Sequence, residues 1–209
     1  VFSSSAATYG MPTVGEVDED YNCQPINPYG ETKLVGEWMV DAAAAAWGLR
    51  GVNLRYFNVA GAGWPDLADT AVANLVPIVF AAIRAGKSPI VFGDDYDTPD
   101  GSCIRDYIHI NDLCTAHWLG LQSLMKGGGS QRYNLGNGNG FSVQEVIDTA
   151  KWVTGKPIVV RDAPRRNGDP NRLVANATRA KKILGWQPKY ADLKTIVAHS
   201  WKWEQLQKT

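Results

Sequence analysis

The sequence predicts an α/β fold, in which the second half of a doubly wound parallel sheet is joined to a small C-terminal α/β domain. The chain opens in a strand-like run that ends in a serine cluster at residues 3–5, and a second strand-like run follows at 52–57. A long helical run at 28–47 lies between them, and this strand–helix–strand order is typical of a parallel sheet. From about residue 61 the elements are shorter and the polar loops longer. We therefore expect one domain in residues 1–60, to which some later segments return, and a second domain mainly in 61–209.

The helix predicted at 28–47 has clear signals at both ends. Pro28 suits the first helical turn, the alanines at 42–46 have high helix propensity, and Gly48 ends the helix. The strand that follows ends in a loop beginning at Asn58. Because functional residues gather at the carboxyl ends of parallel strands, we expect the serine cluster and Asn58 at one edge of the sheet.

The remaining elements follow from apolar periodicity and turn residues. Ser142 and Glu145 have the spacing of a capping box, which predicts the start of a helix. We expect strands at 90–92, 104–110, 133–136 and 157–161, and helices at 72–85, 111–125, near 178–184 and at 191–206.

Composition excludes several classes of protein. The 21 basic and 21 acidic residues balance, so no charge excess favours nucleic acid or an anionic membrane as a partner. No apolar run approaches the roughly 20 residues of a membrane span. The three widely spaced cysteines lack metal-ligand spacing and indicate free thiols in a cytoplasmic protein, without a metal site. The chain starts without Met in a strand-like run, so we expect an N-terminal truncation.

A Tyr-x-x-x-Lys pair, Tyr29 and Lys33, lies at the start of the long helix. Residues four apart share a helix face, and an ammonium group beside a phenol lowers the phenol's pKa towards neutrality. This spacing alone is weak evidence for a catalytic pair, because Tyr190 and Lys194 have the same spacing. Only the first pair has a serine cluster nearby, so we expect Tyr29 to be catalytic and Tyr190 to lie at a solvated helix start.

Six segments in order then resemble a known family: SSSAATYG, NPYGETKL, LRYFNVAGA, FGDDYDTPDGSCIRDYIHINDL, YNLGNGNGFSVQEV and APRRNGDP. Together they resemble the UDP-glucose (UDP-galactose) 4-epimerases of the extended short-chain dehydrogenase/reductase family, across essentially the whole chain. The resemblance implies a Rossmann-like sheet domain that binds NAD and a smaller domain that binds a UDP-sugar. The Gly-rich dinucleotide fingerprint is not among the 209 residues.

The resemblance implies an isomerase that interconverts UDP-glucose and UDP-galactose in galactose metabolism through a transient 4-keto sugar. Tyr29 would take the proton of the sugar 4-hydroxyl, Lys33 would hold the cofactor ribose, and Ser5 would bind the 4-oxygen. Ser3, Ser4, Tyr29, Lys33 and Tyr56 would contact NAD. The residues implied for the UDP-sugar are Ser5, Asn58, Asn74, Leu75, Ile90, Phe92, Arg105, Arg166, Asp169 and Leu173.

Further expectations concern residues outside these sets. Tyr107 is expected to pack in the interior or behind the ligand-binding residues, and His109, His117 and His199 to be structural. Leu173 leaves the specificity for N-acetyl sugars open. The resemblance also implies a cytoplasmic homodimer in which the helix at 28–47 forms half of the interface.

Two other functions remain open. A nucleotide-sugar dehydratase or decarboxylase of the same superfamily is one, although Ala6 stands where dehydratases carry an acidic residue. The other is a non-catalytic nucleotide-sugar-binding module, and this fragment alone is expected to be inactive.

Overall fold

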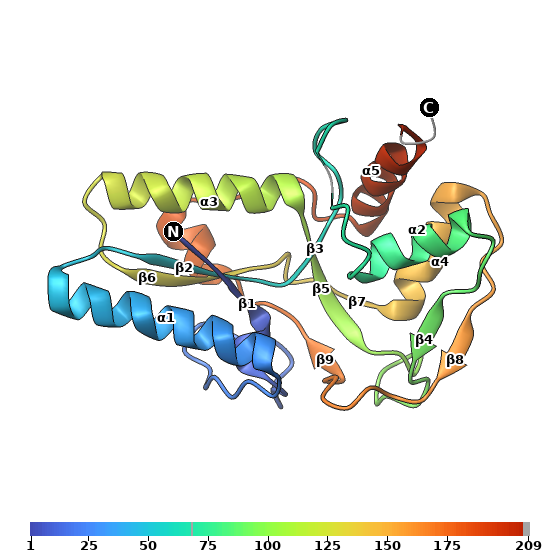
Figure 1. The fold of residues 1–209 in the computed structure, drawn as a ribbon, viewed down its shortest axis with the longest axis horizontal. Coiled ribbons are helices and arrows are strands. Elements are labelled where there is room, and N and C mark those ends of the chain that lie inside the picture. The colour runs from blue at the N-terminus through green and yellow to red at the C-terminus, as the bar shows by residue number, and fades with distance from the viewer. Residues whose placement is uncertain (68, 207–209) are drawn as a thin grey trace.

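The computed structural model describes residues 1–67 and 69–206, which form two groups of packed strands and helices (Figure 1). The first group is a parallel sheet in the order β1 (Phe2–Ser5), β2 (Val52–Tyr56) and β6 (Gln131–Leu135). Figure 1 shows α1 (Pro28–Trp47) and α3 (Ile110–Met125) on opposite sides of this sheet. The predicted α/β fold with a doubly wound parallel sheet is confirmed.

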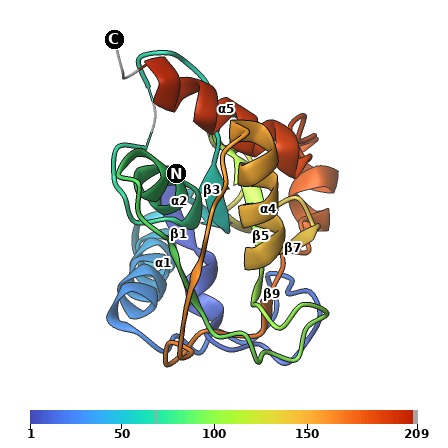
Figure 2. The same cartoon turned by 90° about the vertical axis from the view of Figure 1, so that its right-hand side faces the viewer.

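The second group surrounds a mixed sheet. Its strand β5 (Ile104–His109) pairs in parallel with β3 (Asn58–Ala60) and β9 (Arg172–Leu173), and in antiparallel with β7 (Gly140–Ser142). A separate parallel pair is formed by β4 (Ile90–Phe92) and β8 (Arg161–Ala163). The helices of this group are α2 (Leu75–Arg84), α4 (Val143–Thr154) and α5 (Leu193–Leu206), which Figure 2 shows together with β3, β5 and β7. Two short helices, η1 (Ala6–Tyr9) and the π-helical η2 (Ala180–Leu184), complete the elements.

Two hydrophobic clusters correspond to these two groups. One is built around Leu54, Ile108 and the fully buried Trp186, between the first sheet, α3 and η2. The other is built around Phe80, Ile147 and Trp201 at the contacts of α2, α4 and α5. The helices therefore bury their apolar sides on both groups of strands, as the amphipathic patterns in the sequence predict.

A buried ion pair joins α1 to the first sheet. Arg55 donates from Nε and a terminal nitrogen to the two carboxylate oxygens of Glu37, at 2.8 and 2.6 Å, and both residues are at most 3% exposed. Glu37 also accepts a 2.5 Å hydrogen bond from Ser4 of β1. Because an unpaired charge at this depth would be strongly destabilising, the ion pair fixes the position of α1 relative to β1 and β2.

Several predicted boundaries need correction. The strand expected at 157–161 begins only at Arg161, whose amide donates to the carbonyl of Pro89 at 2.9 Å, because pairing with β4 decides where extended chain becomes a strand. The helix expected from 72 begins at Leu75, and the helix expected from 191 begins at Leu193. The helix expected near 178–184 is a single π-helical segment.

Candidate functional site

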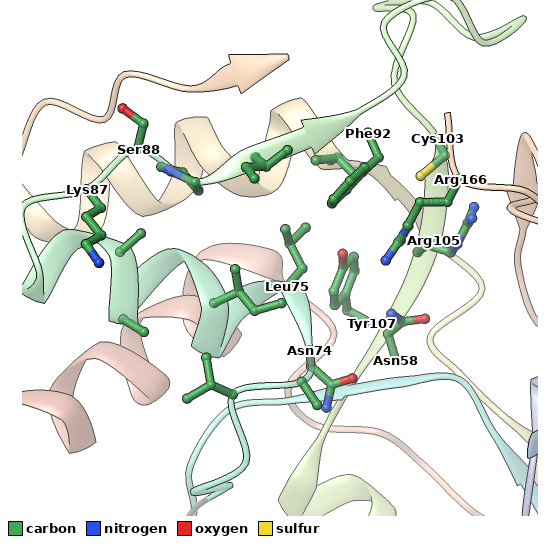
Figure 3. A pocket seen from close by; sticks show the side chains of 18 of the residues that line it. Asn58, Asn74, Leu75, Lys87, Ser88, Phe92, Cys103, Arg105, Tyr107 and Arg166 are labelled. Carbon is green, nitrogen blue, oxygen red and sulfur yellow. The ribbon is translucent and has the colours of Figure 1, made fainter. Parts of the chain in front are cut away.

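A cavity of about 550 Å³ lies between α2, β4 and the strands β3 and β5 (Figure 3). This volume is within the range of small-molecule sites, roughly 300–1,000 Å³. Seven of the ten residues predicted to bind substrate line it, and they come from five separate parts of the chain: Asn58, Asn74, Leu75, Ile90, Phe92, Arg105 and Arg166. The fold therefore gathers in one cavity most of the residues that the sequence analysis assigned to one ligand.

The sheet register places the polar residues of the cavity floor. Asn58 is the first residue of β3 and pairs with Tyr107 of β5, so their side chains lie on the same face. Arg105 precedes Tyr107 by two residues and shares that face, because strand side chains alternate. Asn58 was expected in a loop, and its place in β3 is what aligns it with β5.

Two guanidinium groups make the cavity wall electropositive. The Arg166 guanidinium carbon lies 4.9 Å from the centroid of the Phe92 ring. Asp169 accepts from Arg166 Nε at 2.8 Å and from a terminal nitrogen of Arg105 at 3.3 Å. Arg105 also donates to the main-chain oxygens of Ile104 and Pro170, both at 2.8 Å. One carboxylate thus neutralises only part of two cations, which leaves a net positive charge for an anionic ligand.

Asp169 and Leu173 do not line the cavity. Asp169 instead holds the two arginines, and Leu173 on β9 packs against a cluster that contains Phe57 and Ala6. Asn74 lines the cavity, and its side-chain amide donates to Asp69 at 3.2 Å instead of capping α2.

Tyr107 is the cavity residue whose role sequence reasoning missed. It was expected to pack in the interior, yet it lines the cavity with its hydroxyl directed inwards (Figure 3). The strand period of two could have found it, because Arg105 already pointed to a ligand and Tyr107 must share its face. Cys103, Lys87 and Ser88 also line the cavity without having been predicted.

The predicted catalytic pair lies at the start of α1. Asn27 caps this helix by accepting from the Gly30 amide at 2.8 Å. Lys33 Nζ lies 5.5 Å from the centroid of the Tyr29 ring and donates to the main-chain oxygen of Ser3 at 2.9 Å. The Tyr29 side chain is 53% exposed. The ammonium group is therefore held between the phenol and the end of β1.

Close packing brings η1 against the first turn of α1. A Cβ atom at Gly30 would lie 2.5 Å from the carbonyl oxygen of Ala7, so only glycine fits there. Ser5 caps η1 by accepting from the Ala7 amide at 3.1 Å. Ser5 also pairs in register with Tyr56 of β2, so these two residues lie side by side at the carboxyl ends of adjacent strands.

The other two serines of the cluster use their hydroxyls within the protein. Ser4 is fully buried and donates to Glu37, on the α1 side of the sheet. Ser3 faces α3, where its hydroxyl lies 3.2 Å from His117 Nε2. Burial raises the pKa of the neighbouring Tyr56, and a hydrogen bond from Ser3 partly offsets this effect.

The histidines have partners that the sequence did not reveal. The fully buried His109 accepts from the Asn111 amide at 3.1 Å, and its Nε2 lies 3.0 Å from His199 Nδ1. His117 Nδ1 donates to the Leu113 carbonyl at 2.9 Å. Within residues 1–67 and 69–206, no group of three or more His, Cys, Asp or Glu side chains could hold a metal ion.

The second Tyr-x-x-x-Lys pair differs from its prediction. Tyr190 precedes α5 and is half-buried, with its ring 4.5 Å from that of His109 and 5.5 Å from that of His199. Lys194 lies 4.9 Å from the Trp152 ring. The expectation of a solvated helix start is therefore wrong for Tyr190, because aromatic packing against α5 and β5 covers it.

The fold and the site define a class of protein: an α/β protein with a parallel sheet, a Tyr/Lys pair at the start of a long helix, and an electropositive cavity lined by two arginines. Residues 1–136 match the model of the NAD dependent epimerase/dehydratase family, and the chain belongs to this family.

Individual proteins are similar over nearly the whole chain. A UDP-glucose 4-epimerase from Halalkalibacterium halodurans is 50% identical over 209 residues, which cover 98% of this chain and 63% of that protein. A crystal structure of a UDP-glucose 4-epimerase has a TM-score of 0.94 at 48% identity and covers 100% of this chain and 64% of its own. One from Stenotrophomonas maltophila, with bound NAD and formylated UDP-arabinopyranose, has a TM-score of 0.91 at 40% identity, over 99% of this chain and 63% of its own. The chain thus spans about three-fifths of the length of the curated relatives it matches.

Proposed function

We propose that this chain carries the UDP-sugar site and the proton-transfer residues of an NAD-dependent epimerase that interconverts UDP-glucose and UDP-galactose at carbon 4 of the sugar. The observation that carries the proposal is the cavity of about 550 Å³, which collects seven residues predicted for one nucleotide sugar. Relatives named UDP-glucose 4-epimerase, one of them 50% identical, support the same assignment.

The free edge of β4 suits a pyrimidine base. On the other edge of this strand, hydrogen bonds from Arg161 N to Pro89 O and from Gly93 N to Ala163 O connect it to β8. Since successive residues of a strand direct their main-chain groups to opposite sides, the N–H and C=O groups of Ile90 and Phe92 face away from β8. Both residues line the cavity, so these groups can pair with the polar edge of a uracil while the Phe92 ring contacts its face.

The arginines suit the diphosphate. Arg105 and Arg166 present planar groups of N–H donors, which match phosphate oxygens. Asp169 orients both and remains about one-fifth exposed, so it can also accept from a ribose hydroxyl. Asn58 lies on the sheet two residues after Tyr56, and this short segment leads from the cavity to the candidate proton-transfer residues.

Tyr29 takes the proton of the sugar 4-hydroxyl in this proposal, and it returns the proton when the sugar has turned over. Lys33 Nζ lies 5.5 Å from the centroid of the Tyr29 ring, so a positive charge is next to the group that exchanges the proton. Ser5, at the carboxyl end of β1, holds the 4-oxygen.

NAD, when bound, supplies a reversible hydride acceptor for carbon 4. The residues around Tyr29 fit its nicotinamide end: the phenol is half-exposed, and Lys33 uses one of its three N–H bonds on Ser3, which leaves two for ribose hydroxyls. Tyr56 is the third residue that we propose to contact this end of the cofactor. Because the hydroxyls of Ser3 and Ser4 are used inside the protein, we propose that the end of β1 contacts the cofactor through its main chain.

We further propose a homodimer in the cytoplasm. No helix within residues 1–67 and 69–206 is long and apolar enough to cross a membrane. Cys23, Cys103 and Cys114 are all free thiols, which suits a reducing compartment.

The exposed side of α1 carries Trp38 and Met39, 58% and 67% exposed, which supports contact with a second copy.

The test is conversion of UDP-galactose to UDP-glucose by the product of the complete reading frame that encodes this chain. We expect Tyr29→Phe to lower kcat by about 10² to 10⁴, because it removes the proton-transfer group, while UDP binding is retained. Tyr190→Phe is the matched control, since it has the same spacing to a lysine, and it should leave kcat unchanged. Wild-type protein that binds UDP but converts no UDP-galactose, or a Tyr29→Phe variant with full activity, would refute the proposal.

A further inference from the structure

Tyr107 has an almost completely buried ring and a hydroxyl without a partner. The residue is 3% exposed, and its ring belongs to the hydrophobic cluster that contains Phe80 and Val91. Its hydroxyl makes no hydrogen bond to any residue in 1–67 or 69–206. Figure 3 shows this hydroxyl directed into the cavity that Tyr107 helps to line. The one polar atom of the side chain is thus presented to whatever fills the cavity.

The groups around the Tyr107 hydroxyl indicate which kind of ligand atom could accept a hydrogen bond from it. Asn58 lies directly across the strand pair, and Arg105 lies two residues away on the same face of β5. Arg105 is also the charged group that acts most strongly on Tyr107, and it lowers the pKa of the phenol against the larger raising effect of burial. Guanidinium and amide donors so close together favour a ligand rich in acceptor oxygens.

We propose that the Tyr107 hydroxyl donates a hydrogen bond to a phosphate oxygen of the bound nucleotide, beside Arg105. The inference rests on the proposed function, which places a nucleoside diphosphate in this cavity. Tyr107 is then a ligand-binding residue that sets affinity through the diphosphate, in addition to the arginines.

A second consequence separates this role from a structural one. The Tyr107 hydroxyl faces the cavity and makes no hydrogen bond to the residues in 1–67 or 69–206, so replacing it with hydrogen breaks no hydrogen bond within that part of the protein. Tyr107→Phe should therefore leave the Tm of the ligand-free protein unchanged, while it weakens binding of the nucleotide. If Tyr107 were needed only for packing, the substitution would not combine an unchanged Tm with weaker binding.

The test compares two buried tyrosines by calorimetric titration with UDP, using the product of the complete reading frame. We expect Tyr107→Phe to raise the Kd for UDP about tenfold, the loss of one hydrogen bond to a charged acceptor. Tyr133→Phe is the matched control. Tyr133 is 0% exposed and its hydroxyl also lacks a partner among the described residues, but that hydroxyl is sealed in the first hydrophobic cluster and is not part of the cavity. The Kd of the Tyr133→Phe variant for UDP should differ from that of the wild-type protein by less than twofold.

Uridine, which lacks phosphate, completes the test. If Tyr107 contacts a phosphate oxygen, Tyr107→Phe and wild-type protein should bind uridine equally well, as measured by NMR titration. Equal Kd values for UDP, or an equal loss for UDP and uridine, would overturn the inference. If wild-type protein fails to bind UDP at all, it is the proposed function that fails.

Discussion

At the residue scale, the buried histidine pair shows how packing changes titration. Burial, with a smaller effect from the adjacent His199, lowers the pKa of His109 from 6.5 to about 4. His109 Nδ1 accepts from the Asn111 amide, so a second proton on the ring would displace this hydrogen bond. The neutral ring is therefore the form that the folded protein requires.

This pair leads to a prediction about stability and pH. Between pH 6.5 and 4 the unfolded chain binds a proton at His109 that the folded chain does not bind, so the free energy of unfolding falls as the pH falls through this range. The loss is on the order of 3 kcal/mol, at about 1.4 kcal/mol for each pKa unit. Urea denaturation of the wild-type chain and a His109→Gln variant from pH 7 to 4 should show the difference shrinking towards pH 4. A difference that is constant with pH would contradict the prediction.

The residue scale also explains what was missed. Arg105, Asn58 and Phe92 were predicted because short motifs carry them, and the structure brings them into one cavity. The strand period places Tyr107 on the same face of β5 as Arg105, but the motif that contains both does not show which segments close a cavity over that face. That depends on α2 and the segment of Arg166, which contribute the opposite walls from distant parts of the chain.

At the element scale, local end signals predicted helices better than strands. The bounds of α1 coincide with the predicted helix, because Pro28 and Gly48 act within the helix itself. The bounds of β8 differ from those of the predicted strand, because they depend on a partner strand about 70 residues away in sequence. A helix satisfies its own hydrogen bonds, whereas a strand needs another strand to do so.

The capping box of α4 allows a prediction at this scale. Ser142 accepts from the Glu145 amide at 3.0 Å, and the Glu145 carboxylate accepts from the Ser142 amide at 2.7 Å. The Ser142 hydroxyl also donates to Asp100, in the loop before β5. We expect Ser142→Ala to lower the free energy of unfolding by about 1 kcal/mol or somewhat more, as measured by urea denaturation.

Ser142→Thr is the control for this prediction, because threonine retains the hydroxyl and should recover most of the stability. If both variants were equally destabilised, volume at this position would matter more than the cap.

At the scale of the whole molecule, the exposed side of α1 is the main candidate for contact between copies. Val35, Trp38 and Met39 are spaced three and four residues apart and are 45%, 58% and 67% exposed. Such spacing forms one stripe on a helix, and Ala42 and Ala46 continue it. A contiguous apolar stripe of this kind favours packing against a second copy of the same helix.

We expect the double variant Trp38→Glu, Met39→Glu to convert a dimer into a monomer, because two charges would be buried in the interface without partners. Light scattering after size-exclusion chromatography measures the mass. Trp152→Glu, at a tryptophan that is 69% exposed on α4, is the control and should leave the mass unchanged. A wild-type monomer would argue against the proposed homodimer.

The division into domains also belongs to this scale. We propose a boundary near residue 60, with α3, β6 and η2 returning to the first sheet. The pairing of β2 with β6 and the hydrophobic cluster that contains Trp186 support this division.

The sequence by itself determined the fold class, the ends of α1 and the capping box of α4, because strand–helix order and helix caps depend on residues close together in the chain. The residue types of the site were implied by the resemblance of short motifs to a known family. Only the tertiary structure decided that the hydroxyls of Ser3 and Ser4 turn inwards, that Asp169 holds two arginines, and that Tyr107 faces the cavity. Each of these depends on which distant segments pack together. Packing is decided by the burial of the whole chain, and no short stretch of sequence contains that information.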